Sequence, residues 1–330
     1  MNKMVFLVLT VLLLFLVLPA VGESELYTDK EYEYNLLEDG TAEIVKYNGT
    51  ETEIEIPAVL NGHMVSSLGE GAFNRNRELI SVIIPEGITK IGESAFYSCS
   101  NIERLELPDG ITEIGKMAFG ECTMLRGINL PASLTALGDS AFYECHSLTQ
   151  ITVPEGITQI GRTTFYHCEA LTSLILPNSI TAIGPCAFEG CESLKTLDIP
   201  QGISVIENNT FSQCKSLVFL ELPEGITEIG SCAFFGCDAM RCVVIPASVT
   251  AIAEDAFMVI SGNWERVINP QVMIVAEAGS FAEKYCEDSG LYYSAEVPAE
   301  IMDLINTPAG TLNSAGKNGN RNVSDSLNLW

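Results

Sequence analysis

Phenylalanine recurs every 23 residues through most of this chain. It occupies Phe73, Phe96, Phe119, Phe142, Phe165, Phe188, Phe211, Phe234 and Phe257. Proline keeps the same period at Pro85, Pro108, Pro131, Pro154, Pro177, Pro200, Pro223 and Pro246. Cysteine does so at Cys99, Cys122, Cys145, Cys168, Cys191, Cys214 and Cys237. Three markers with one period indicate a repeated structural unit, so this spacing limits the possible folds more than any other feature.

Each repeat reads as one coil of a stack. The segment Leu174-Ile175-Leu176 alternates inward and outward side chains, as a short strand does. The following proline ends the strand in a turn. Inward isoleucines come next, then Gly161 changes the chain direction, and we expect a short helical turn to carry Phe165 into the core.

A single coil of this size cannot stand alone. Its few apolar side chains contribute roughly 1.5–3 kcal/mol each when buried, whereas ordering the backbone costs roughly 1–2 kcal/mol per residue. Stacked coils cover each other's apolar faces, so the repeats predict a solenoid. Nine coils at about 4.8 Å per strand would form a rod roughly 40 Å long.

The two ends of the array have the features of caps. Asp39-Gly40 lies between two alternating segments and predicts a hairpin turn. Near the other end, Ser280 is a suitable N-cap for a helix that Gly290 would stop. The ninth coil departs from the pattern, with Ile260 in place of cysteine, which we interpret as the transition to the cap.

The consensus P-x-G-I-T-x-I-G-x-x-A-F-x-x-C-x-x-L-x-x-L-x-L resembles the BspA-like branch of the leucine-rich repeats over residues 54–293. The resemblance implies a mostly β, right-handed solenoid of the α/β class, with an N-terminal β cap and a C-terminal helical cap. It also implies a bacterial secreted or surface protein that works in adhesion or recognition.

The N-terminus has the pattern of a secretory signal peptide. Lys3 precedes an apolar run from Met4 to Leu18, and small residues stand at Ala20 and Gly22. We expect cleavage after Gly22, although an uncleaved membrane anchor is an alternative. The predicted organisation is a signal peptide (1–22), a β cap (23–62), the repeats (63–270), a C-terminal cap (271–297) and a disordered tail (298–330).

Acidic residues outnumber basic ones by 43 to 17, and the formal net charge is −26. Such a surface disfavours nucleic acid and a bare anionic membrane as partners. The charge has two interpretations, which are simple solubility and attraction of a basic partner.

Eleven cysteines in a secreted chain would ordinarily indicate disulfides. Seven of these, however, share one repeat position, where parallel side chains point into the core. We therefore predict free, buried thiols. The chain contains no C-x-x-C pair, and its three histidines accompany no catalytic motif. We expect no metal, no cofactor and no enzymatic activity.

The outward strand positions vary from coil to coil, so the fold does not determine them. We predict that a partner binds there, and the alternative is drift without constraint. The candidate binding residues are Arg104, Glu106, Asn129, Gln150, Thr152, Ile175, Thr196, Asp198, Phe219 and Glu221. Ile175 and Phe219 favour binding because exposed apolar groups often mark interaction sites. The predicted partner is a protein, and the alternative is a glycan or mucin.

A threonine column also recurs, at Thr89, Thr112, Thr135, Thr158, Thr181, Thr227 and Thr250. Such a column could bind ice or a regular glycan, but mutual support of neighbouring coils is the interpretation we prefer.

Overall fold

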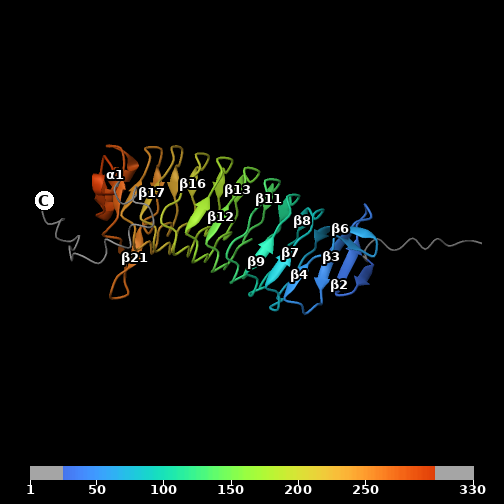
Figure 1. Cartoon of the computed structure of the whole chain (residues 1–330). Coiled ribbons are helices and arrows are strands. Elements are labelled where there is room, and N and C mark those ends of the chain that lie inside the picture. Colours follow the sequence, from blue (N-terminus) through green and yellow to red (C-terminus); the bar gives the residue numbers. More distant parts are fainter. Residues whose placement is uncertain (1–24, 302–330) are drawn as a thin grey trace, which may run out of the picture.

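The computed structural model describes residues 25–301, which form one elongated solenoid whose coils follow each other in sequence order (Figure 1). The predicted signal peptide (1–22) and residues 302–330 of the predicted tail lie outside this range. The architecture is a mostly β solenoid of about 11 turns, counted with its end regions. This confirms the predicted fold class, with two more turns than the nine predicted coils.

Two parallel ladders run along the solenoid. We call the first the main sheet. It contains β4 (Glu53–Glu55), β7 (Ser81–Ile83), β9 (Arg104–Glu106), β12 (Gln150–Thr152), β14 (Ser173–Ile175), β17 (Phe219–Glu221), β19 (Cys242–Val244), β23 (Met273–Val275) and β24 (Tyr292–Ser294). Gln150 pairs with Ser173, a register of one 23-residue repeat. The strands therefore stack as the spacing of the prolines predicts.

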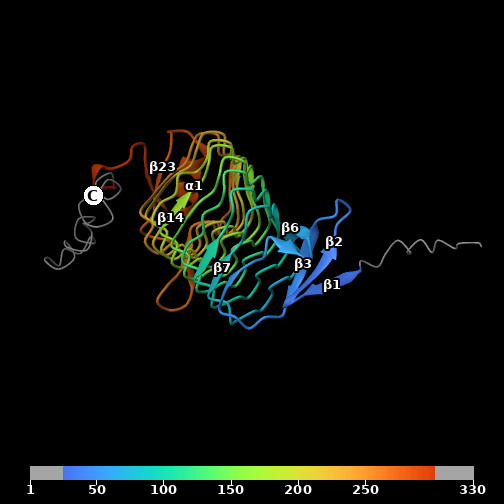
Figure 2. The ribbon, with the colours of Figure 1, turned by 45° about the vertical axis from the view of Figure 1, so that its right-hand side comes forward.

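The second ladder uses shorter strands. It contains β6 (His63–Leu68), β8 (Lys90–Ile91), β10 (Glu113–Ile114), β11 (Ala136–Leu137), β13 (Gln159–Ile160), β15 (Ala182–Ile183), β16 (Val205–Ile206), β18 (Glu228–Ile229) and β20 (Ala251–Ile252). Here Glu113 pairs with Ala136, again one repeat apart. Most coils thus contribute a three-residue strand to the main sheet, and every strand of the second ladder after β6 has two residues, with turns between the two ladders (Figure 2).

The repeated phenylalanines form a continuous stack through the core. All nine rings are at most 1% exposed. Neighbouring ring centroids lie 4.8–5.9 Å apart, with interplanar angles of at most 22°. Offset stacked rings add roughly 0.5–1.5 kcal/mol per pair to the burial energy. The stack therefore holds each coil against both neighbours.

The short helical turn that we expected before each phenylalanine is absent, and this expectation was wrong. Between residues 63 and 270, all of which the structure describes, no α-helix forms. Thr163 and His167 instead adopt left-handed conformations, with φ of 51° and 53°. The Phe165 amide donates to the Ala187 carbonyl of the next coil at 2.9 Å. These amides bind the neighbouring coil and are not available for helical hydrogen bonds.

The N-terminal cap is the predicted hairpin with one added strand. β1 (Leu26–Asp29), β2 (Tyr32–Leu36) and β3 (Ala42–Tyr47) pair antiparallel in that order, and Gly40 has a φ of 82° in the turn between β2 and β3. β3 then pairs parallel with β6, while β5 (Val59–Leu60) forms a small hairpin with β6. The Tyr47 ring lies 5.4 Å from the Phe73 ring, so the cap also covers the end of the phenylalanine stack.

The C-terminal cap combines a helix with two further strands of the main sheet. Helix α1 (Phe281–Ser289) begins after Ser280, whose hydroxyl accepts a hydrogen bond from the Glu283 amide, and ends at Gly290 with a φ of 75°. The Tyr285 ring lies 6.3 Å from the Phe257 ring and covers the last ring of the stack. The predicted helix start and stop are both confirmed.

The irregular ninth coil forms a hairpin of β21 (Met258–Ile260) and β22 (Arg266–Ile268). This hairpin projects from the side of the solenoid (Figure 1). Arg266 lies over the Phe235 ring, 5.1 Å from its centroid, and so attaches the hairpin to the preceding coil.

All eleven cysteines are free, and the seven ladder cysteines are fully buried. Each ladder thiol donates to the carbonyl of the phenylalanine in the preceding coil, as Cys145 does to Phe119 at 3.2 Å. Burial raises the pKa of Cys99, Cys145 and Cys191 to about 12. The predicted free core thiols are therefore confirmed, and these thiols stay protonated at neutral pH.

Coils approach each other closely at the glycine that follows most of the short strands, although Glu207 and Ala253 occupy this position in two coils. A Cβ atom on Gly138 would lie 2.4 Å from the Lys116 amide nitrogen and 2.5 Å from the Gly115 carbonyl carbon. A Cβ atom on Gly127, which lies on the main sheet, would have no neighbouring atom within 4 Å. The two glycines therefore differ in the space available to them.

Replacing Gly138 with alanine should lower the free energy of unfolding by about 1–3 kcal/mol, because two rigid backbones must move apart. Gly127→Ala is the matched control and should change that free energy by less than about 0.5 kcal/mol. Urea denaturation followed by circular dichroism measures both. Equal effects of the two substitutions would contradict close coil packing.

Iodoacetamide at pH 8 should modify at most Cys186 and Cys232 in the native protein, because these two cysteines are half-buried and the others are buried. Alkylation needs an accessible thiolate, and burial prevents both access and ionisation. Mass spectrometry should count all eleven modifications after unfolding in urea. Sites that stay unmodified in urea without reductant would show disulfides and refute the free-thiol ladder.

Candidate functional site

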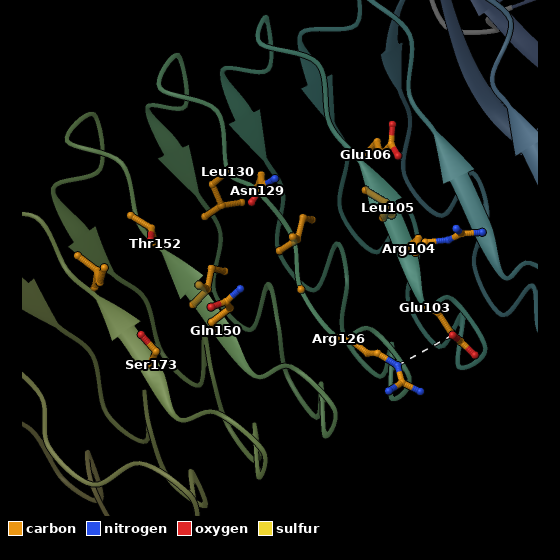
Figure 3. A pocket seen from close by; sticks show the side chains of 14 residues that line it. Glu103, Arg104, Leu105, Glu106, Arg126, Asn129, Leu130, Gln150, Thr152 and Ser173 are labelled. Carbon is orange, nitrogen blue, oxygen red and sulfur yellow. Dashed lines mark ion pairs between the residues drawn. The ribbon is translucent and has the colours of Figure 1, made fainter. Parts of the chain in front are cut away.

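The outward side chains of the main sheet form the candidate site. Gln150 and Thr152 project from β12, and Ser173 projects from β14 beside them (Figure 3). Between these outward residues, Ile151 and Leu174 point into the core and are at most 8% exposed. The alternation that the sequence predicts therefore places the variable residues together on one face.

The main sheet is not continuous, because two coils lack a strand on this side. The sheet divides into β4-β7-β9, β12-β14 and β17-β19-β23-β24. Residues 126–130 contribute only an isolated bridge between Gly127 and Gln150, and residues 194–199 contribute no strand. The face is hollowed at both interruptions.

The first depression has a volume of about 650 Å³ and surrounds the interruption at residues 126–130. Six of the ten predicted site residues line it, namely Arg104, Glu106, Asn129, Gln150, Thr152 and Ile175. Ile175 is 57% exposed there, so an aliphatic side chain stands among polar groups.

The second depression has a volume of about 470 Å³ and surrounds the other interruption. The remaining four predicted site residues line it, namely Thr196, Asp198, Phe219 and Glu221. The structure thus brings all ten residues to one face, in two groups. Whether they bind a partner stays a prediction.

Charge is distributed unevenly between the two depressions. In the first, Arg126 Nε lies 4.0 Å from Glu103 Oε2 (Figure 3), and Arg104 pairs with Glu53 at 3.7 Å. In the second, Asp198 and Glu221 form no ion pair or side-chain hydrogen bond with any residue in the range 25–301. The first depression is therefore nearly neutral, whereas the second is acidic.

Phe219 is less exposed than Ile175, contrary to the expectation that both are exposed apolar groups. It packs against a small cluster of Cys242, Val275 and Ile301. Ile301 belongs to the segment that follows β24, and only 9% of it is exposed. This segment covers the end of the outward face, which no repeat pattern indicates because the segment lies beyond the repeats.

Sequence reasoning missed part of the first depression. Glu103 and Arg126 line it although they lie five residues before the proline, whereas the ten predicted residues lie two or four before it. Extending the comparison by one position would have found them, because that position also varies from coil to coil.

Metal-binding residue types are not clustered within residues 25–301. No group of three or more His, Cys, Asp or Glu residues lies close enough there to hold a metal ion. His167 lies 3.5 Å from Glu169, and the ring of His63 contacts the Gly40 carbonyl at 3.0 Å. Neither histidine has a nucleophile as a hydrogen-bond partner. No helix among the described residues has the length and apolar character to span a membrane.

The threonine column supports the stacking of coils. The Thr112 hydroxyl donates to the Thr89 carbonyl at 3.2 Å, and five further threonine hydroxyls make the same bond at 3.2–3.4 Å. Because six of the seven hydroxyls already bind the preceding coil, the column resembles a structural ladder more than a binding surface.

Comparison with known proteins agrees with this geometry. The family model of the BspA type leucine rich repeat region matches residues 47–163 and 135–262. A leucine-rich repeat protein of T. pallidum is 30% identical, with a TM-score of 0.49, and the match covers 66% of this chain and 91% of that one.

A leucine-rich repeat protein of Bacteroides ovatus is 25% identical over 77% of this chain and 79% of that one, with a TM-score of 0.57. A leucine rich cell surface protein of Faecalibacterium prausnitzii is 24% identical over 83% of this chain and all of that one, with a TM-score of 0.39. A search of curated proteins found no match. The 23-residue period, the stacked coils and the matched family model together show that the chain belongs to the BspA-type leucine-rich repeat family.

Proposed function

We propose that this chain is a recognition or adhesion module that binds a protein partner through the outward face of the main sheet. One observation carries the proposal. The ten variable outward residues, chosen because the fold does not determine them, line two neighbouring depressions on a single face. Solenoid proteins generally use such extended faces for binding, because the outward residues of the stacked repeats do not take part in the core packing.

The composition of the face also favours a protein partner. Ile175 supplies an exposed aliphatic anchor, and Asn129, Gln150 and Thr152 around it supply hydrogen-bonding groups. An apolar centre with a polar surround is the usual arrangement of a protein interface. The net charge of −26 is unfavourable for nucleic acid.

We further propose that the protein acts outside the cell, secreted or on the surface. The apolar N-terminal segment with its small-residue cleavage site supports this location. The proposal assigns no catalytic role, because a long open face without a clustered acid, base and nucleophile does not provide a reaction site.

Ile175→Asp should weaken binding of a protein partner about tenfold to a hundredfold, because a charge would replace the anchor of the first depression. Surface plasmon resonance against purified extracellular-matrix and plasma proteins would identify the partner with the wild-type chain and then measure the variant. Ile260→Asp is the matched control, since Ile260 is 45% exposed on the projecting hairpin.

A partner that binds wild type and Ile175→Asp with equal affinity would remove this face from consideration. Binding to immobilised mucin that is lost in Ile175→Asp, without binding to any protein of the panel, would favour the glycan alternative on the same face.

A further inference from the structure

A second surface lies where each coil turns after its buried phenylalanine. The residue that follows the phenylalanine is tyrosine in three of four consecutive coils, at Tyr97, Tyr143 and Tyr166. All three rings are partly exposed. None of them lines either depression of the main sheet. We call the surface formed by Tyr97, Gly120, Glu121, Tyr143, Glu144, Tyr166 and His167 the tyrosine surface.

The rings of this surface are ordered by direct contact. Tyr143 and Tyr166 stack with centroids 5.0 Å apart and an interplanar angle of 2°. His167 contacts Tyr166 edge-on at 4.5 Å. Tyr166 covers one face of Tyr143, so the opposite face of Tyr143 is directed toward the preceding coil, which carries Gly120.

Gly120 places no side chain against that opposite face from its own coil. A Cβ atom at this position would lie 3.1 Å from Tyr97 Cδ2, so the ring of Tyr97 leans across from the coil beyond. Tyr97 and Tyr143 therefore flank a coil that places no side chain between them at this position.

Carboxylates accompany the rings at the next position along the chain. Glu121 and Glu144 have left-handed φ values of 57° and 54° in the same turns as the rings. The Tyr97 hydroxyl donates to Glu121 Oε1, and a hydrogen bond with Glu144 raises the pKa of Tyr143. Neither carboxylate forms an ion pair with any residue between 25 and 301. Each therefore keeps further acceptor positions, since a carboxylate accepts about four hydrogen bonds.

This combination fits a sugar. The C–H groups on one face of a pyranose ring pack on an aromatic ring, and the sugar hydroxyls donate to carboxylate oxygens, which only accept. The charge selects among glycans. Unpaired carboxylates on a chain of net charge −26 repel sulfated, sialylated and uronic acid sugars. A neutral sugar carries no such penalty.

We propose that the tyrosine surface binds a neutral oligosaccharide, with the face of Tyr143 that is turned toward Gly120 as its stacking platform and Glu121 and Glu144 as hydrogen-bond acceptors. This site is separate from the outward face of the main sheet and does not depend on the function proposed for that face. It would allow the protein to hold a glycan and a protein partner at the same time.

The test is affinity electrophoresis of the full chain in gels that contain laminarin, xyloglucan, galactomannan or dextran, with hyaluronan and heparin as charged comparators. The wild-type protein should be retarded by at least one neutral polysaccharide and by neither charged one. Tyr143→Ala should weaken that retardation at least tenfold. Tyr292→Ala is the matched control, because Tyr292 is 58% exposed on the C-terminal cap, and it should bind like wild type.

Two further variants separate binding from stability. Tyr143→Phe keeps the ring and should retain most of the binding. Gly120→Ala keeps every aromatic ring but adds a methyl group beside Tyr97, and it should weaken binding while the melting temperature stays close to that of wild type. Ile175→Asp should bind the polysaccharide normally, because it alters only the main sheet.

Several results would overturn the proposal. These are no retardation by any neutral polysaccharide, retardation by heparin or hyaluronan alone, or equal losses in Tyr143→Ala and Tyr292→Ala. Loss of polysaccharide binding in Ile175→Asp would also overturn it, because it would place the glycan on the main sheet.

Discussion

Contact between successive coils is the interaction on which the whole structure depends. Each phenylalanine ring lies between two other aromatic rings, and neighbouring phenylalanine rings are at most 5.9 Å apart. Threonine hydroxyls and cysteine thiols donate hydrogen bonds to the preceding coil, whereas the phenylalanine amides donate to the next coil. A coil separated from its neighbours would lose all of these contacts together, which explains why both ends carry caps of different sequence.

This constraint also explains where variation is tolerated. At Gly138 a side chain has no space, because the Lys116 and Gly115 backbone of the preceding coil lies directly beside it. Positions that face solvent, such as Gln150 and Thr152, touch nothing that the stack requires. A BspA-type solenoid can therefore change its outer surfaces from coil to coil without any loss of core packing, which suits a protein that recognises other molecules.

The two surfaces discussed above arise in different ways. The outward face of the main sheet is hollowed where residues 126–130 and 194–199 interrupt the ladder. The tyrosine surface exists because two left-handed residues per coil replace the helical turn and direct Glu121 and Glu144 outward beside the rings. Both are departures from a uniform repeat, and each creates local chemistry that a perfectly regular solenoid would lack.

Local patterns along the chain were enough to predict the solenoid, its 23-residue register, the buried phenylalanine stack, the free thiols and the helix between Ser280 and Gly290. These features follow from local patterns that repeat, and a regular repeat places each residue beside its counterparts in the adjacent coils. Three features required the folded structure: the two interruptions of the main sheet, the packing of Ile301 against Phe219, and the replacement of the helical turn. These depend on backbone hydrogen bonds and packing between residues in different coils or beyond the repeats, where the consensus carries no information.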